Sequence, residues 1–121
     1  MNLKTKRVYK EASESDGYRI LTERLWPRGV SKQRARLDRW MKGIAPTHDL
    51  RKWFGHDPDK WEEFKDRYRK ELFGSKAVEE LATIIQKEEM VTLVYASKDQ
   101  QHNSTVVLKE FMEDLLGSNH G

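Results

Sequence analysis

The chain has 121 residues, of which 23 are lysine or arginine and 20 are aspartate or glutamate, and it contains no cysteine. This length suits one domain with a core of its own, and the missing cysteines exclude disulfides and thiolate metal sites. No apolar run approaches the roughly 20 residues that span a bilayer, and the basic N-terminus lacks the apolar stretch of a signal peptide. We therefore expect no membrane association and a cytoplasmic location.

Basic residues are concentrated in the first third of the chain. Residues 1–40 carry 11 basic and 5 acidic residues, whereas residues 41–121 carry 12 basic and 15 acidic residues. This asymmetry favours an anionic ligand or partner. A charged face that only solvates a small domain is the alternative.

The first predicted elements are two strands with a polar loop between them. We expect a short strand at residues 6–9, a loop at 13–17 and a second strand at about 18–24. The second strand alternates poorly, which indicates burial on both faces. The side chains expected to be buried there are Ile20, Leu21 and Leu25.

Two helices are predicted in the next segment. The first follows Ser31, a typical N-cap residue, and is ended by Gly43 and Pro46. Its apolar face would consist of Leu37, Trp40, Met41 and Ile44. A second, short helix is predicted at 49–54, starting near Thr47.

The pair Asp57-Pro58 is a strong helix start, because a capping carboxylate precedes a proline at the first helical position. The apolar stripe of this helix would be core and consists of Trp61, Phe64, Tyr68 and Leu72. Gly74 ends the helix, and Ser75 caps the next one. That helix is expected to bury Val78, Leu81, Ile84 and Ile85.

Residues 90–96 form the clearest predicted strand, a continuous apolar run rich in β-branched side chains that fits a central position. A polar loop at 97–103 leads into a last helix. Its apolar residues are Val107, Leu108, Phe111, Met112 and Leu115. We expect one α/β domain at 1–116 and a flexible tail at 117–121.

Strands separated by helices predict a short, mainly parallel sheet flanked by helices. Ligands of such sheets bind beyond the carboxyl ends of the strands. Two polar turns leave predicted strand ends, so we expect both at one rim of the sheet.

The first candidate cluster follows the second predicted strand and consists of Glu23, Arg24, Trp26, Arg28 and Ser31. Arginine presents a planar fork of donors suited to phosphate or carboxylate, and Pro27 and Gly29 would fix the turn. We assign Arg24, Trp26 and Arg28 to ligand binding. Ion pairs that only stabilise the turn are the alternative.

The second candidate cluster follows the last predicted strand and consists of Tyr95, Ser97, Lys98, Asp99, His102 and Asn103. His102 is the candidate general acid or base, because imidazole titrates near neutrality. Asp99 is the second catalytic candidate, and helix capping is its alternative role. Ligand-binding assignments in this cluster are Tyr95, Lys98 and Asn103.

A third cluster lies around His56, which would point either into a cleft or into water; we include it among the ligand-binding candidates. Trp53 and Phe54 would be core or a pocket wall. Phosphate-binding and dinucleotide-binding loops are missing, and the four histidines lack zinc-ligand spacing. We therefore expect no cofactor and no metal.

Four segments together resemble the YeaO-like family of uncharacterised bacterial proteins, within domain of unknown function number 488. They are residues 16–19, 24–32, 50–58 and 94–103, and the resemblance covers most of the chain. It implies a small α/β domain in the bacterial cytoplasm without an assigned substrate, cofactor or reaction. The chain departs from the family at Glu23, where aspartate is common, at Ser104, where a second histidine often follows, and in lacking cysteines around the last strand.

Three functions follow from these observations. The first is a site for an anionic or phosphorylated small ligand at the carboxyl rim, with or without catalysis. The second is a non-catalytic interaction or regulatory domain. The third is a nucleic-acid-binding module whose phosphate contacts would be Arg28, Lys32, Arg34, Arg36 and Arg39. The sequence does not indicate an oligomeric state.

Overall fold

In the described part of the chain, four parallel strands form one sheet in the spatial order β1–β4–β2–β3. The structure is a computed structural model and describes residues 2–117. The strands are β1 (Leu3–Arg7), β2 (Tyr18–Leu21), β3 (Arg39–Trp40) and β4 (Val91–Tyr95). This arrangement confirms the predicted α/β class with a parallel sheet.

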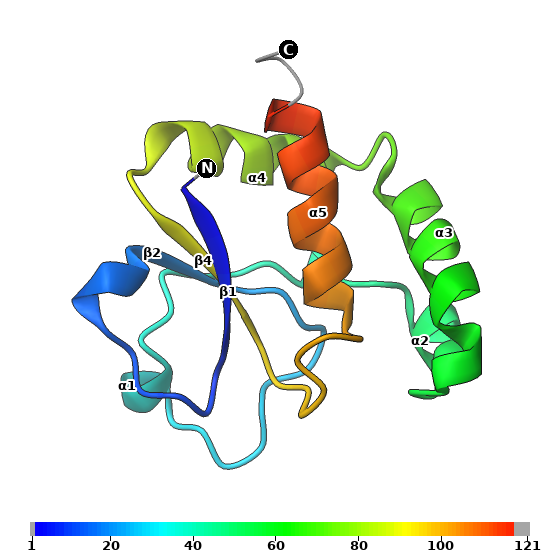
Figure 1. Cartoon of the computed structure of the whole chain (residues 1–121). Coiled ribbons are helices and arrows are strands. Elements are labelled where there is room, and N and C mark those ends of the chain that lie inside the picture. The colour runs from blue at the N-terminus through cyan, green and yellow to red at the C-terminus, as the bar shows by residue number, and fades with distance from the viewer. Residues whose placement is uncertain (1, 118–121) are drawn as a thin grey trace.

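Residues 2–117 also form five helices, which pack around the strands unevenly (Figure 1). They are α1 (Lys32–Ala35), α2 (His48–Phe54), α3 (Trp61–Leu72), α4 (Lys76–Lys87) and α5 (Ser104–Gly117). Short 3-10 turns add Glu14–Asp16, Lys42–Ile44 and Pro58–Lys60. The predicted tail at 118–121 lies outside the described residues. Among residues 2–117, no helix combines the length and the apolarity that a membrane crossing needs.

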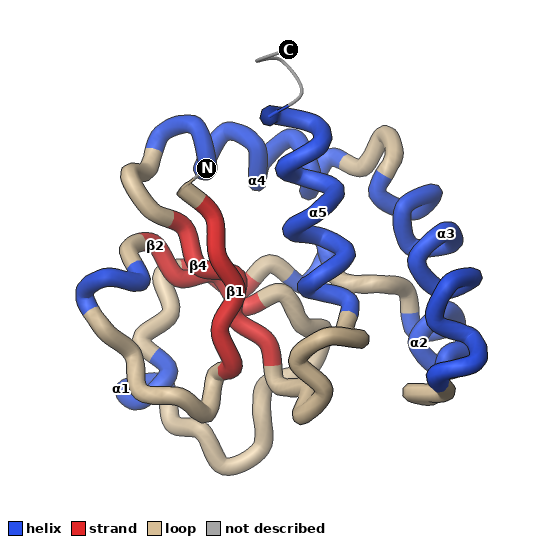
Figure 2. The backbone as a smooth tube through the Cα atoms, viewed as in Figure 1, coloured by secondary structure: helices blue, strands red, loops and turns tan. Residues whose placement is uncertain are grey.

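The two faces of the sheet are covered differently. One face packs against α3, α4 and α5, and the strand residues it contributes to that core are Leu3, Ile20, Val91 and Leu93. The other face packs against loops and α1, in a smaller core of Val8, Leu21, Val30, Ala35 and Val94. Figure 2 shows this asymmetry, with most helices on one side of the strands and long loops on the other. All five residues of β4 are buried, which confirms the predicted central strand.

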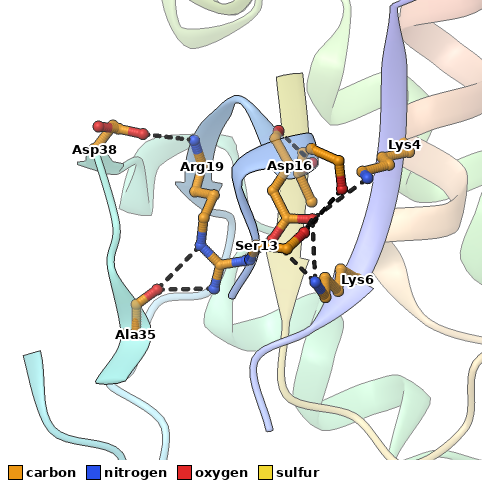
Figure 3. A network of polar contacts seen from close by, with 9 residues as sticks. Lys4, Lys6, Ser13, Asp16, Arg19, Ala35 and Asp38 are labelled. Carbon is orange, nitrogen blue, oxygen red and sulfur yellow. Dashed lines mark hydrogen bonds and ion pairs between the residues drawn. The ribbon is translucent and has the colours of Figure 1, made fainter. Parts of the chain in front are cut away.

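A buried carboxylate joins β1 to β2 on the loop-covered face of the sheet (Figure 3). Asp16 forms ion pairs with Arg19 at 2.6 Å, with Lys6 at 3.0 Å and with Lys4 at 3.3 Å. Burial alone raises the pKa of Asp16, but the Ser13 backbone N–H and the three cations outweigh it and hold that pKa well below its usual range. Three of the eleven basic residues of the first third thus share a single carboxylate, which balances one of their three positive charges.

The predicted helix from Ser31 to Gly43 is wrong beyond its first turn. Ser31 caps α1 as expected, accepting from the backbone of Arg34, but the helix ends at Ala35, and Arg36 takes a left-handed conformation with φ 47°. The cause is tertiary: the guanidinium of Arg19 donates to the carbonyl oxygen of Ala35 at 2.7 and 3.1 Å. The chain after it then pairs with β2 as strand β3.

Predicted caps that depend on local sequence are confirmed. The side chains of Asp57 and Ser75 each accept a hydrogen bond from a backbone N–H in the first turn that follows. Thr47, near which the second helix is predicted to start, caps α2 in the same way. The predicted burial of Leu25 is wrong, since this side chain is 69% exposed.

Candidate functional site

A cavity of about 600 Å³ opens at the carboxyl ends of β2 and β4. Its walls come from the residues that follow these strands, from α2 and from the start of α5. This is the rim at which parallel sheets bind ligands, and the volume suits a small molecule.

Helix α2 forms a basic wall of the cavity. Leu50 and Phe54 are buried beneath it, so His48, Arg51 and Lys52 face outward at positions i, i+3 and i+4 and line the cavity. Neither Arg51 nor Lys52 forms an ion pair with any residue in the described range 2–117. Among the described residues, both cations therefore line the cavity without an ion-pair partner.

The end of α2 turns His56 back toward the same cavity. Gly55 has a left-handed conformation and ends the helix, and His56 follows with a φ of 57°. The imidazole of His56 lies 5.9 Å from the ring of Phe54, centroid to centroid, and lines the cavity. A non-glycine residue with positive φ is uncommon and held by its surroundings.

The loop between β4 and α5 forms the opposite wall and is ordered by its own hydrogen bonds. Oδ1 of Asp99 accepts from the backbone N–H groups of Gln101 and His102, both at 2.9 Å. These two bonds, the one from His102 first, hold the pKa of Asp99 below its usual range. Oδ2 of Asp99 lies 3.1 Å from Nδ1 of His102, so the carboxylate orients the imidazole.

Asn103 is the N-cap of α5. Its Oδ1 accepts from the backbone of Val106 at 3.0 Å, and its Nδ2 donates to the carbonyl oxygen of Asp99 at 2.8 Å. The ring of His102 stands edge-on to Trp61, with the two centroids 5.1 Å apart. Both His102 and Asn103 line the cavity, so this wall combines an imidazole with the first turn of a 14-residue helix.

One acidic residue, Glu23, stands among the lining side chains of the described chain. Its Oε1 accepts from the backbone N–H of Ala96 at 3.1 Å, which links the ends of β2 and β4. The rest of the lining includes two cations and three histidines, so basic groups prevail. Apolar surface comes from Leu25 at the edge and from Phe54 and Phe64.

Three of the predicted site residues come together in this cavity, namely His56, His102 and Asn103. The other predicted residues do not line it: Arg24, Trp26, Arg28, Tyr95, Lys98 and Asp99. Ligand binding or catalysis by these six residues stays a prediction from the sequence.

The contacts of these six residues are mainly structural. Arg24 donates from Nε to the carbonyl oxygen of Pro46, and Trp26 donates from Nε1 to the carbonyl oxygen of Val30 at 2.6 Å. Tyr95 is buried, and this burial raises its pKa. Arg28 and Lys98 are exposed, and Asp99 orders its loop as described above.

Sequence reasoning missed His48 and Arg51. Their spacing in the sequence could have identified them, because His48, Arg51 and Lys52 share one face of a short helix whose other face carries Leu50 and Phe54.

Within residues 2–117, no three histidine, aspartate or glutamate side chains stand close enough together to hold a metal ion.

Comparisons with known proteins identify uncharacterised bacterial relatives. Residues 2–120 match a family described as the inactive DUF488-N3 subclade. The uncharacterized protein YeaO of Escherichia coli (strain K12) is 39% identical over 115 residues, which are 95% of this chain and 100% of that protein. The uncharacterized proteins Mb3100c of Mycobacterium bovis and Rv3073c of Mycobacterium tuberculosis are each 36% identical over 106 residues, 88% of this chain and 89% of theirs. No solved structure matches the chain significantly.

Proposed function

Because the chain belongs to the inactive DUF488-N3 subclade, we propose that its cavity binds a small anionic ligand without catalysing a reaction on it. The observation that carries this proposal is the pair Arg51 and Lys52, which line the cavity without an ion pair in the described chain. A charge-assisted hydrogen bond to phosphate or carboxylate is stronger than a neutral one, and an arginine can make two such bonds in parallel. A ligand with an anionic group can form such hydrogen bonds with both Arg51 and Lys52.

The opposite wall supports the same ligand class. The N-terminal end of α5 carries the positive end of the helix dipole, and Asn103 and Ser104 line the cavity there. His102 is oriented by Asp99, so its ring offers a second hydrogen-bonding group to the ligand. In this proposal the histidine binds and does not transfer protons.

The apolar part of the lining indicates that the ligand is more than an inorganic anion. Leu25 is 69% exposed at the cavity edge, and Phe54 and Phe64 lie deeper. A ligand with an anionic group and an apolar body covers Leu25 and removes its surface from water.

The absence of catalysis is supported by two points. The matched subclade is described as inactive, and this chain has no cysteine, whereas the wider family that it resembles often carries cysteines around the last strand. We place this binding function in the bacterial cytoplasm.

Thermal unfolding with added ligand tests the proposal. Phenyl phosphate carries both an anion and an apolar ring, and it should raise the melting temperature of the wild type more than inorganic phosphate does. The double variant Arg51→Ala/Lys52→Ala should lose this response. The matched control Lys70→Ala/Lys76→Ala also removes two exposed lysine or arginine charges and should keep it.

Two outcomes would contradict the proposal. One is a double variant that responds to phenyl phosphate as the wild type does. The other is hydrolysis of phenyl phosphate by the wild-type protein and not by Arg51→Ala/Lys52→Ala, measured by phosphorus NMR after prolonged incubation, which would make the site catalytic.

A further inference from the structure

The segment from Arg24 to Leu37 contains five basic residues and no acidic residue. The fold lays part of this segment against the loop that follows β1, as the position of α1 in Figure 1 shows. The hydroxyl of Tyr9 donates to the carbonyl oxygen of Arg28 at 3.1 Å, and Nη2 of Arg34 donates to the carbonyl oxygen of Tyr9 at 3.3 Å. We call the exposed cations gathered here the basic corner: Lys10, Arg28, Lys32 and Arg34.

The basic corner holds positive charge that the fold leaves unneutralised. None of its four side chains pairs with a carboxylate in the part of the chain that the structure describes. Other basic residues of the first third are paired, for example Arg19 with Asp16 and Arg39 with Glu80. Within the described chain, seven basic residues of the first third have no ion pair, and four of these seven lie in the basic corner.

An aromatic side chain lies among these cations. The ring of Tyr9 is partly exposed, and the guanidinium of Arg7 lies 5.0 Å from its centroid. Arg7 is itself held in place, because its Nε donates to the carbonyl oxygen of Ser97 at 2.9 Å. The sequence around Arg28–Arg39 has no interleaved aromatic of this kind, and the fold supplies Tyr9 from a different segment.

We propose that the basic corner binds the backbone of a single-stranded nucleic acid, with Tyr9 as a platform for one base. Cations that follow a phosphate backbone, together with an aromatic ring on which a base stacks, are the two components of sequence-tolerant single-strand binding. None of the four cations, nor Tyr9, lines the cavity at the carboxyl rim. The two surfaces can therefore be tested separately.

Fluorescence anisotropy with labelled twelve-nucleotide oligo(dT) and oligo(U) tests this proposal. With about four phosphates neutralised, affinity should fall about 50-fold between 50 and 200 mM salt. The triple variant Arg28→Gln/Lys32→Gln/Arg34→Gln should bind about tenfold or more weakly at 50 mM salt and show a much shallower salt dependence. Tyr9→Ala should weaken binding about tenfold, whereas Tyr9→Phe should retain it.

The matched control is Lys70→Gln/Lys76→Gln/Lys87→Gln, which removes three exposed charges away from the basic corner. It should bind as the wild type does, and circular dichroism should show both triple variants folded. The proposal is overturned by undetectable binding at 50 mM salt or by an equal loss in the control variant. Binding to phosphatidylserine vesicles but not to either oligonucleotide would also overturn it.

Discussion

Nε of Arg24 donates a hydrogen bond of 2.7 Å to the carbonyl oxygen of Pro46. Nη2 of the same guanidinium reaches the carbonyl oxygen of Ala45 at 3.3 Å. These contacts tie the segment after β2 to the segment that enters α2, the basic wall of the cavity. Arg24 therefore acts on the site through the position of α2 and does not itself line the cavity.

Replacing Arg24 should lower the stability of the whole fold. Arg24→Ala removes two charge-assisted hydrogen bonds and leaves the Pro46 carbonyl without its donor, so we expect a loss of about 2 kcal/mol in the free energy of unfolding. Arg24→Lys keeps the charge and should lose less. Urea denaturation measures both, and a loss below about 0.5 kcal/mol for Arg24→Ala would place this contact among ordinary surface interactions.

Asp16 should be among the most sensitive positions of the chain. Asp16→Asn leaves the buried guanidinium of Arg19 without its carboxylate, and breaking a buried pair in this way costs about 3–5 kcal/mol. The exposed residue Asp66, which forms no ion pair in the described chain, provides the control Asp66→Asn. Equal free energies of unfolding for the two variants would show that the buried ion pairs contribute nothing net.

The same carboxylate should make stability depend on pH. The pKa of Asp16 in the folded state lies below its ordinary value of 3.8, so its contribution is fully present above that value. As the pH falls through 3.8 toward the folded-state pKa, the unfolded chain takes up the proton first and stability is lost. The difference in unfolding free energy between wild type and Asp16→Asn should therefore shrink from pH 5 to pH 3; a constant difference would contradict this assignment.

Gly17 should tolerate no side chain, in contrast to Gly29. Both have positive φ, 65° and 73°, but a Cβ at Gly17 would lie 2.3 Å from the carbonyl oxygen of Met90, whereas a Cβ at Gly29 has no heavy atom within 4 Å. Gly29→Ala should cost about 1–2 kcal/mol from backbone strain alone. Gly17→Ala should cost clearly more, and similar losses for both in thermal or urea unfolding would contradict the close approach.

Local sequence signals predicted much of the fold correctly. The run of apolar and β-branched residues in β4 indicated a strand buried on both faces, and the predicted caps at Asp57 and Ser75 depend on atoms only a few residues away. The predicted helix after Ser31 ends early because Arg19, which lies 16 residues before Ala35, donates to the carbonyl oxygen of Ala35. The periodicity of apolar residues after Ser31 cannot predict a contact with a side chain from another segment.

The cavity lies at the rim that the sequence analysis indicated, but its lining matches the predicted residues only in part. Strand ends at β2 and β4 located the rim, and the loop 97–103 does form one wall. The opposite wall is α2 and not the turn after β2, because the turn's arginine donates to backbone carbonyl oxygens. The outward spacing of His48, Arg51 and Lys52 becomes informative only when α2 is known to stand across from α5.

Binding of an anion between α2 and the start of α5 is the central claim, and chemical-shift mapping of the nitrogen-15-labelled protein tests it most directly. Titration with phenyl phosphate should shift backbone amides at 48–56 and 97–104, and the Arg51→Ala/Lys52→Ala variant should lose these shifts. Shifts confined to other parts of the chain, or the same shifts in the variant, would contradict the claim.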